Sequence, residues 1–369
     1  MTRRCSPWWW LLGALLAARG AHAQPAQHPR LATPTRPRSS WNAFPLMAYQ
    51  NETGFGFGGF GVHYFRLGGA PADSPPSYVA AAAMYTTRSQ LLLDVLPEFW
   101  WDHERSVITG QVSYRLFPDR FYGIGNDTLA ADEERYQLNS VNDRMEFRRR
   151  VAGPLFLGLR QEFQAWRLEE LLPTGMLATA NLPGSAGGVR SGFGPLLVLD
   201  SRDNTLATRR GVYVLAALLS YHPWLGSTHT YTAFTVDARH YHSTGRHTLA
   251  VQYYLALSDG DVPLTGMPMM GGKTLMRGHY EGRFRDRNFF TVQAEYRLMP
   301  LWWRFGINVF AGLGEVAPRL RDFTFEGLKW SLGAGVRFAL NPAERIHLRL
   351  DAGFGYDTWG LYVNVLEVF

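Results

Sequence analysis

The sequence predicts an all-β protein, a closed antiparallel transmembrane β-barrel of about sixteen strands. Three observations predict it: alternating apolar residues over 328–354, an aromatic content of 14%, and an export signal at the start of the chain. Successive side chains of a strand point to opposite faces, so an alternating segment has one apolar and one polar face. A barrel with lipid outside and a polar lumen inside requires these two faces.

The alternation is clearest near the end of the chain. Lys329, Arg337, His347, Arg349 and Asp351 share the polar parity with serine and glycine residues. A soluble sandwich also alternates, but charges on the second face, aromatic-rich strand ends and an export signal together favour a barrel. The apolar parity contains Leu328, Trp330, Leu332, Ala334, Val336, Phe338, Leu340, Ile346, Leu348, Leu350, Ala352 and Phe354.

Residues 1–23 have the pattern of a signal peptide. Arg3 and Arg4 precede a short apolar core over 8–17, and Ala21-His22-Ala23 forms a small-x-small cleavage site. The apolar core is too short to span a bilayer as an anchor. Cys5 is the only cysteine and would leave with the signal. We therefore expect a mature chain without disulfides or a cysteine metal site.

The net charge of +6 falls to +3 once the arginines at 3, 4 and 19 are removed. The remaining basic residues are spread along the chain, which argues against a nucleic-acid partner. After the signal, no apolar run reaches about 18 residues, so no transmembrane helix is indicated. An outward-facing barrel surface with aromatic girdles explains why an exported chain is nevertheless rich in aromatic residues.

Residues 24–43 are rich in Pro, Arg and Ala and lack periodicity, which predicts a flexible periplasmic tail before a barrel over 44–369. Pro45 lies in the first expected strand, which is short, and proline cannot donate to a ladder. The sixteen expected strands are 44–50, 55–66, 77–87, 90–100, 105–116, 135–149, 153–168, 188–200, 210–222, 229–242, 246–258, 288–299, 303–315, 328–340, 345–356 and 358–369.

The faces of several strands can be assigned because Arg or Lys on the lipid face near mid-membrane costs about 2–4 kcal/mol. Leu249, Tyr253 and Leu257 should face lipid, as should Phe305, Ile307 and Val309. Val292, Ala294 and Tyr296 should face out, with Gln293, Glu295 and Arg297 in the lumen. With a periplasmic N-terminus, the long connections 117–134, 169–187 and 259–287 lie outside the cell.

The 259–287 connection carries Gly271-Gly272-Lys273-Thr274-Leu275-Met276-Arg277-Gly278-His279-Tyr280. This segment resembles the Arg-Gly-aromatic motif in the sixth outer loop of the BamA/TamA-type bacterial surface antigen family. Three further segments agree in order and spacing: residues 51–54, residues 121–128, and Asp200-Ser201-Arg202-Asp203-Asn204 followed by Gly211. The sequence is therefore similar to that family over 44–369, in a form without the family's periplasmic POTRA domains. The family's Phe-x-Asp-x-Gly wall motif reads Phe310-Ala311-Gly312-Leu313-Gly314 here, without its Asp.

The resemblance implies a sixteen-stranded barrel that inserts or translocates other outer-membrane proteins. It implies a loop that folds into the lumen, with Arg277 against the inner wall and Gly271, Gly272, Met276, Gly278, His279 and Tyr280 around it. A buried arginine needs acidic or carbonyl partners. Glu295 is the preferred partner and Asp351 the second. The alternative is that Arg277 is an exposed loop charge.

Asp200, Arg202, Asp203 and Asn204 could suggest a metal or catalytic cluster. A tight turn is the better interpretation, because Asp and Asn side chains cap turns. Residues 271–274 lack the spaced glycine of a phosphate loop. We expect no metal, no cofactor and no enzymatic activity.

Phe369 is the last residue, and Leu361, Val363 and Val365 precede it at alternate positions. This pattern looks like the recognition signal for barrel assembly and is also compatible with an ordinary closing strand. A poorly paired edge between the first and last strands could accept a strand of another protein.

The leading hypothesis is thus an outer-membrane protein that assembles, inserts or translocates client proteins through this edge, with the bilayer and the assembly machinery as partners. The alternatives are a passive pore for small solutes and, third, an outer-membrane hydrolase.

Overall fold

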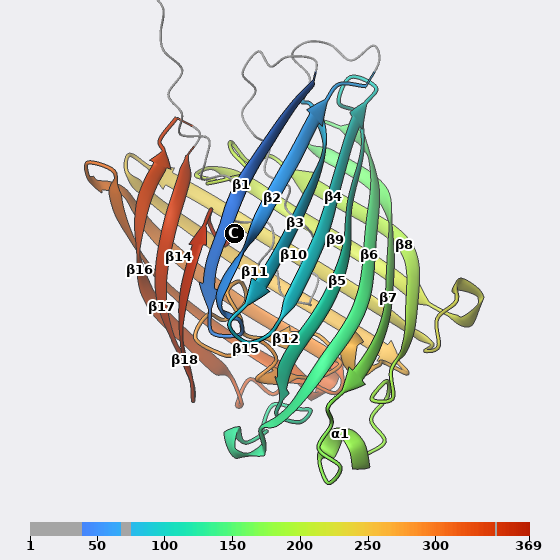
Figure 1. Ribbon diagram of the computed structural model, residues 1–369. Coiled ribbons are helices and arrows are strands. Elements are labelled where there is room, and N and C mark those ends of the chain that lie inside the picture. The colour runs from blue at the N-terminus through green and yellow to red at the C-terminus, as the bar shows by residue number, and fades with distance from the viewer. Residues whose placement is uncertain (1–38, 68–74, 344) are drawn as a thin grey trace, which may run out of the picture.

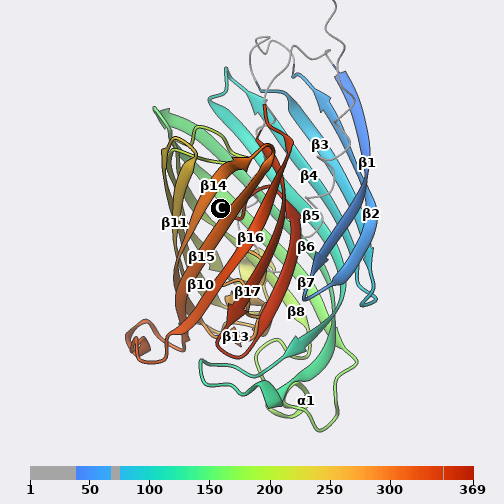
Figure 2. The same ribbon diagram turned by 90° about the vertical axis from the view of Figure 1, so that its left-hand side faces the viewer.

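A computed structural model describes residues 39–67, 75–343 and 345–369 of the chain. The expected signal peptide and residues 24–38 of the expected tail lie outside the described residues. The predicted fold is confirmed: sixteen antiparallel strands form one closed barrel, in the order β1-β18-β17-β16-β15-β14-β11-β10-β9-β8-β7-β6-β5-β4-β3-β2 (Figures 1 and 2). The two remaining strands pair with each other as a small separate sheet.

The barrel strands are β1 (Ser39–Gln50), β2 (Gly54–Phe65), β3 (Ser77–Thr86), β4 (Leu91–Trp101), β5 (Ser106–Phe121), β6 (Glu134–Ala152), β7 (Leu155–Glu169), β8 (Gly188–Asp200), β9 (Gly211–Tyr221), β10 (Tyr231–Thr244), β11 (His247–Gly260), β14 (Asn288–Trp302), β15 (Phe305–Ala317), β16 (Lys329–Asn341), β17 (Ile346–Gly355) and β18 (Trp359–Val365). The separate sheet contains β12 (Met269–Met270) and β13 (Phe284–Arg285). Helical structure in the described residues is limited to α1 (Met176–Thr179) and the 3-10 turns Ala130–Asp132, Pro223–Leu225, Leu264–Gly266 and Leu320–Asp322. None of these helices has the length and apolar character needed to cross a membrane.

The two ends of the barrel differ. The connections over 122–133, 170–187 and 261–287 gather at one end, which we call the long-loop end, while turns such as Gly153–Pro154 lie at the other, the short-turn end. Figure 1 shows α1 below the barrel at the long-loop end and β1 beginning at the opposite end. Antiparallel strands joined by short turns at one end and long loops at the other are typical of outer-membrane barrels.

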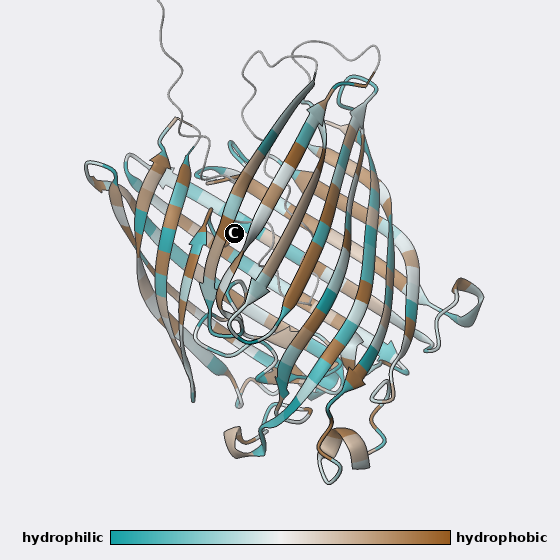
Figure 3. Ribbon diagram, in the orientation of Figure 1, coloured by the Kyte–Doolittle hydropathy of each residue, from teal (hydrophilic) through white to brown (hydrophobic). Residues whose placement is uncertain are grey.

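The predicted faces are confirmed by exposure. Tyr253 is 54% exposed and Val309 50%, whereas Glu295 is fully buried and Arg297 is 5% exposed. Along many of the strands, hydrophilic and hydrophobic colours alternate (Figure 3). Apolar side chains therefore cover the outside, while arginines and carboxylates project into the interior, as a bilayer-spanning barrel requires.

We expect Val309→Arg to destabilise the barrel by about 2–4 kcal/mol, because Val309 lies outward in the middle of β15. The equivalent change at Leu301, beside the turn at the short-turn end, should cost about 1 kcal/mol or less. Urea unfolding in lipid vesicles would measure both free energies. Equal costs at the two positions would contradict the membrane depth assigned to β15.

The junction between β1 and β18, which we call the seam, is sparsely paired. Every residue of β1 is registered with β2, but Tyr49 and Val363 form the single registered pair between β1 and β18. The expectation of a short first strand is wrong, because β1 begins at Ser39, inside the segment expected to be a flexible tail. β18 is the short partner: it ends at Val365, and among the described residues Ser39–Ala48 have no registered partner in β18 (Figure 1).

Candidate functional site

Residues 261–287, which we call the plug loop, fold back into the barrel from the long-loop end. The β12–β13 pairing closes the loop as a hairpin. Gly271 donates its N–H to Leu275 O at 2.9 Å, and Gly272 donates to His279 O at 2.9 Å. Both glycines have positive φ, which only glycine adopts readily. These turns place Met276 and Arg277 deep in the lumen, at 0% and 1% exposure.

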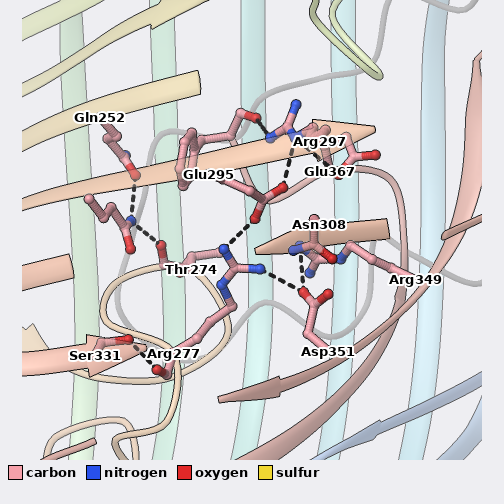
Figure 4. A network of polar contacts seen from close by, with 12 residues as sticks. Gln252, Thr274, Arg277, Glu295, Arg297, Asn308, Ser331, Arg349, Asp351 and Glu367 are labelled. Atoms are coloured by element: carbon pink, nitrogen blue, oxygen red, sulfur yellow. Dashed lines mark hydrogen bonds and ion pairs between the residues drawn. The ribbon is translucent and has the colours of Figure 1, made fainter. Parts of the chain in front are cut away.

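Arg277 lies between two carboxylates of the inner wall. Its guanidinium forms ion pairs with Glu295 of β14 and with Asp351 of β17, the latter at 2.6 Å (Figure 4). Both expected partners are thus present together. Two charge-assisted bonds to different strands hold the plug loop against the wall and offset the cost of burying the cation.

A wider network surrounds this contact. Arg337 of β16 contacts Glu295 at 2.9 Å and Asp351 at 2.6 Å, and Arg297 contacts Glu295 at 2.7 Å. Arg349 lies 3.4 Å from Asp351, and Glu367 contacts Arg337 at 3.1 Å. Four guanidinium groups thus share three carboxylates inside the barrel. Removing one member leaves its partners buried with fewer ion pairs, so the network should act as a unit.

The Phe310 ring supplies the third side of the Arg277 site. The guanidinium carbon of Arg277 lies 3.6 Å from the ring centroid, a cation–π geometry. Phe310 is the first residue of the wall motif that lacks its Asp, and the acidic partners come from neighbouring strands. Gly278 permits the close approach: a Cβ there would lie 2.5 Å from the carbonyl carbon of Phe354.

The plug loop also touches both sides of the seam. On the β18 side, Gly278 N–H donates to the Tyr362 hydroxyl at 3.0 Å, and the Thr358 hydroxyl donates to Gly278 O at 2.6 Å. On the β1 side, Glu281 N–H donates to a carboxylate oxygen of Glu52, in the β1–β2 turn, at 3.0 Å. Two residues of the plug loop, Gly278 and Glu281, therefore connect the two flanks of the seam at the long-loop end.

The side chain of Asn51 adds to this closure. Its amide nitrogen donates to Trp359 O at 2.5 Å, and its carbonyl oxygen accepts from Leu361 N–H at 3.4 Å. The seam is therefore held at the long-loop end and open to pairing at the short-turn end.

His279 and Tyr280 complete the predicted motif. His279 Nε2 lies 2.8 Å from Trp330 O, and burial lowers the pKa of His279, which favours the neutral ring. The Tyr280 hydroxyl donates to Asp119 at 2.9 Å. Gly125 N–H donates to Arg285 O at 2.8 Å. The three segments 51–54, 121–128 and 271–280, distant in sequence, thus meet at the plug loop.

The docked loop should respond to pH through Glu281. Burial, reinforced by the nearby Glu52 and Asp119 carboxylates, raises the pKa of Glu281 to about 8. Between pH 4.5 and about pH 8, the Glu281 carboxyl stays protonated in the docked loop. In an undocked loop it would be deprotonated, because its ordinary pKa is 4.5. Docking should therefore weaken as pH rises from about 4.5 to about 8 and change little above that.

We expect Glu281→Gln to remove most of this dependence, because the amide is neutral at every pH. Proteinase K cleavage of the loop, compared at pH 6 and pH 8.5, would measure it. Wild type should be cut faster at pH 8.5, while the variant should be cut at similar rates. A variant as pH-sensitive as wild type would contradict the assignment to Glu281.

The 200–211 motif forms a turn at the short-turn end. Arg202 pairs with Asp200 at 2.7 Å, and Asp203 accepts the backbone N–H groups of Arg209 and Arg210. Asn204 caps the N–H groups of Leu206 and Ala207. Gly211 has φ of 114° and lies against the backbone at Ser201, where a Cβ would clash. All of these contacts lie within the turn and stabilise it, in agreement with the interpretation of the motif as a tight turn.

The predicted strand over 358–369 is wrong at its end. Leu361, Val363 and Val365 lie in β18, but the last four residues turn into the lumen. Arg297 donates to the main-chain oxygen of Phe369 at 2.6 Å, and the Phe369 side chain packs with Tyr241 and Ala250 across the barrel. Charge explains the turn: Glu367 would face lipid in a continued strand, whereas inside it meets Arg337, Arg297 and His347. An assembly-signal role of these residues stays a prediction.

Sequence reasoning missed Tyr362, Phe310 and Glu367 as parts of this site. The local alternation identifies Tyr362 as an inward residue, but nothing in the sequence pairs it with Gly278, 84 residues away. Glu367 was visible as a charge that interrupts an apolar series, which was the available signal that the strand ends before it.

The fold and this site define a class: a membrane-spanning β-barrel with an arginine-anchored loop in its lumen and a sparsely paired seam. The Omp85 superfamily domain matches residues 97–354, so the chain belongs to the Omp85 superfamily. This family and the apolar outer face indicate the outer membrane.

Solved structures share the fold. BamA from Haemophilus ducreyi, lacking POTRA domains 1–3, has a TM-score of 0.61 at 12% identity, over 89% of this chain and 70% of that one. CdiB from Escherichia coli has a TM-score of 0.57 at 12% identity, over 90% of this chain. CdiB from Acinetobacter baumannii has 0.56 at 11%, over 89% of this chain. The chain spans 63% and 59% of the two CdiB proteins. No curated protein sequence matches the chain.

Proposed function

We propose that this barrel inserts or translocates client proteins at the outer membrane, and that the client strand pairs with the edge of β1 at the seam. The observation that carries the proposal is the register of β1, whose residues 39–48 pair with β2 and have no registered partner in β18. An unpaired strand edge presents free N–H and C=O groups, and an extended segment of another chain can satisfy them.

The contacts of the plug loop support a seam that is available for pairing at one end only. It connects Glu52 on one flank with Tyr362 on the other, so the long-loop end stays closed while the short-turn end is available. A client arriving from the short-turn end would meet the unpaired stretch of β1 first. Membership of the Omp85 superfamily and the fold shared with BamA and CdiB agree with such a role.

A passive pore is the main alternative. The buried plug loop argues against it, because Arg277 and its partners occupy the lumen with almost no exposure to solvent. A hydrolase has no supporting residue set in the described part of the chain, and its exclusion stays a prediction. An interaction with the outer-membrane assembly machinery also stays a prediction.

The test is reconstitution of the purified barrel into liposomes that receive a urea-unfolded outer-membrane protein. We expect the client to fold faster than in protein-free liposomes of the same lipid. Planar-bilayer conductance of wild type and of a variant lacking residues 262–286 gives the second readout. Low conductance in wild type and a large increase on deletion would fit a plugged insertase. High wild-type conductance without any acceleration of client folding would favour the pore.

A further inference from the structure

A cavity, which we call the chamber, lies in the lumen between the plug loop and the wall formed by β7–β11. Its volume is about 100 Å³. Arg160 and Glu162 of β7, Arg190 of β8 and Tyr231 of β10 face it from the wall, and Thr265 and Glu281 face it from the plug loop. The Arg277 network lies on other strands, so the chamber is separate from the Arg277 contact.

The charges around the chamber do not balance. Arg160 pairs with Glu146 at 2.7 Å, and Glu162 pairs with Arg144 at 3.0 Å. Arg190 is then the third guanidinium beside two carboxylates. Glu281 adds little negative charge at neutral pH, because burial raises the pKa of Glu281 to about 8. At least one positive charge is therefore left over beside the chamber, where the surrounding protein screens it less than bulk water would.

Several buried polar groups that line the chamber lack a hydrogen-bond partner among the described residues. They include the Arg160 Nε and the Thr265 hydroxyl, whose residues are 3% and 6% exposed. A buried donor without an acceptor is costly. Guanidinium groups bind oxyanions with several parallel bonds, and a hydroxyl can add another.

We propose that this chamber binds a small oxyanion, of the chemistry of phosphate or a short carboxylate. Such an ion would balance the excess charge and supply acceptors to Arg160, Arg190 and Thr265. The volume fits this class, because one ordered water needs roughly 10–15 Å³ and the chamber could hold several. A nucleotide or an oligosaccharide would be too large.

The site is testable by isothermal titration calorimetry of inorganic phosphate, and separately of acetate, into the purified full-length barrel in phosphate-free buffer at pH 7. We expect saturable binding of one ion per barrel. Arg190→Gln should weaken it at least tenfold, since about 1.4 kcal/mol of lost interaction is a factor of ten. Thr265→Val, which is close in shape, should weaken it about three- to tenfold.

Arg167→Gln is the matched control, because Arg167 is an exposed arginine on the same strand as Arg160. Its affinity should equal that of wild type. Heat-modifiable gel mobility verifies that each variant is folded, and Thr265→Val serves if Arg190→Gln is not. Absence of saturable binding by wild type would overturn the proposal, as would binding that both site variants leave unchanged. Neither outcome tests the pairing of β1 with β18, because Arg190 lies on β8 and Thr265 lies in the plug loop.

Discussion

Arg277→Ala is expected to undock the plug loop and to destabilise the barrel by about 3–5 kcal/mol, the usual cost of removing one partner from a buried ion pair. The physical reason is the double contact of Arg277 with Glu295 and Asp351, both at 0% exposure. Without Arg277, Glu295 and Asp351 each lose one ion-pair partner while both carboxylates stay buried. The loop also loses its cation–π contact with Phe310.

Two measurements check this expectation. Guanidinium unfolding in detergent gives the free energy, and proteinase K on intact cells reports cleavage between Asp259 and Arg287. Arg321→Ala is the control, because the Arg321 side chain is 73% exposed at the same end of the barrel. It should behave as wild type in both assays. Equal cleavage of Arg277→Ala and wild type would mean that Arg277 does not hold the loop.

A disulfide across the seam is expected to block client insertion while leaving the barrel folded, because a client strand that pairs along residues 39–48 then cannot displace β18 at Tyr49. Tyr49 and Val363 are the registered pair, so Tyr49→Cys with Val363→Cys places two thiols opposite each other on adjacent strands. Directly opposed strand residues have Cβ atoms about 4.5–5.5 Å apart, close to what a disulfide requires. Leu46, earlier in β1, would be unsuitable because it has no registered partner in β18.

The rate of client folding in liposomes should fall at least tenfold in the oxidised form and recover on reduction. His240→Cys with Val251→Cys is the matched control, since it joins β10 to β11, a fully registered pair. That lock should leave the rate unchanged in both redox states. Full activity of the oxidised seam variant would falsify strand exchange at the seam and favour transport through the lumen.

The faces of several strands could be predicted, because the direction of a side chain in a strand depends on its neighbours in the sequence. The alternation over 328–354 sets the inward and outward faces of β16 and β17 regardless of which strands lie beside them. Glu295 could be assigned to the lumen because its neighbours Ala294 and Tyr296 fit lipid and it does not. The glycines at 271, 272 and 278 were identified through the family resemblance, and all three have positive φ in the structure.

The ends of the strands at the seam could not be predicted from the sequence. The sequence by itself determined that the chain forms a sixteen-stranded barrel, which residues face lipid, and that Arg277 with Glu295 or Asp351 was a plausible buried pair. Only the tertiary structure decided that β1 begins at Ser39, that β18 stops at Val365, and that Glu367 and Phe369 turn inward. It also decided that the plug loop joins Glu52 to Tyr362 across the seam. The physical reason is range: alternation reports the face of a residue from its neighbours, whereas closing a barrel depends on charges and hydrogen bonds between residues hundreds of positions apart.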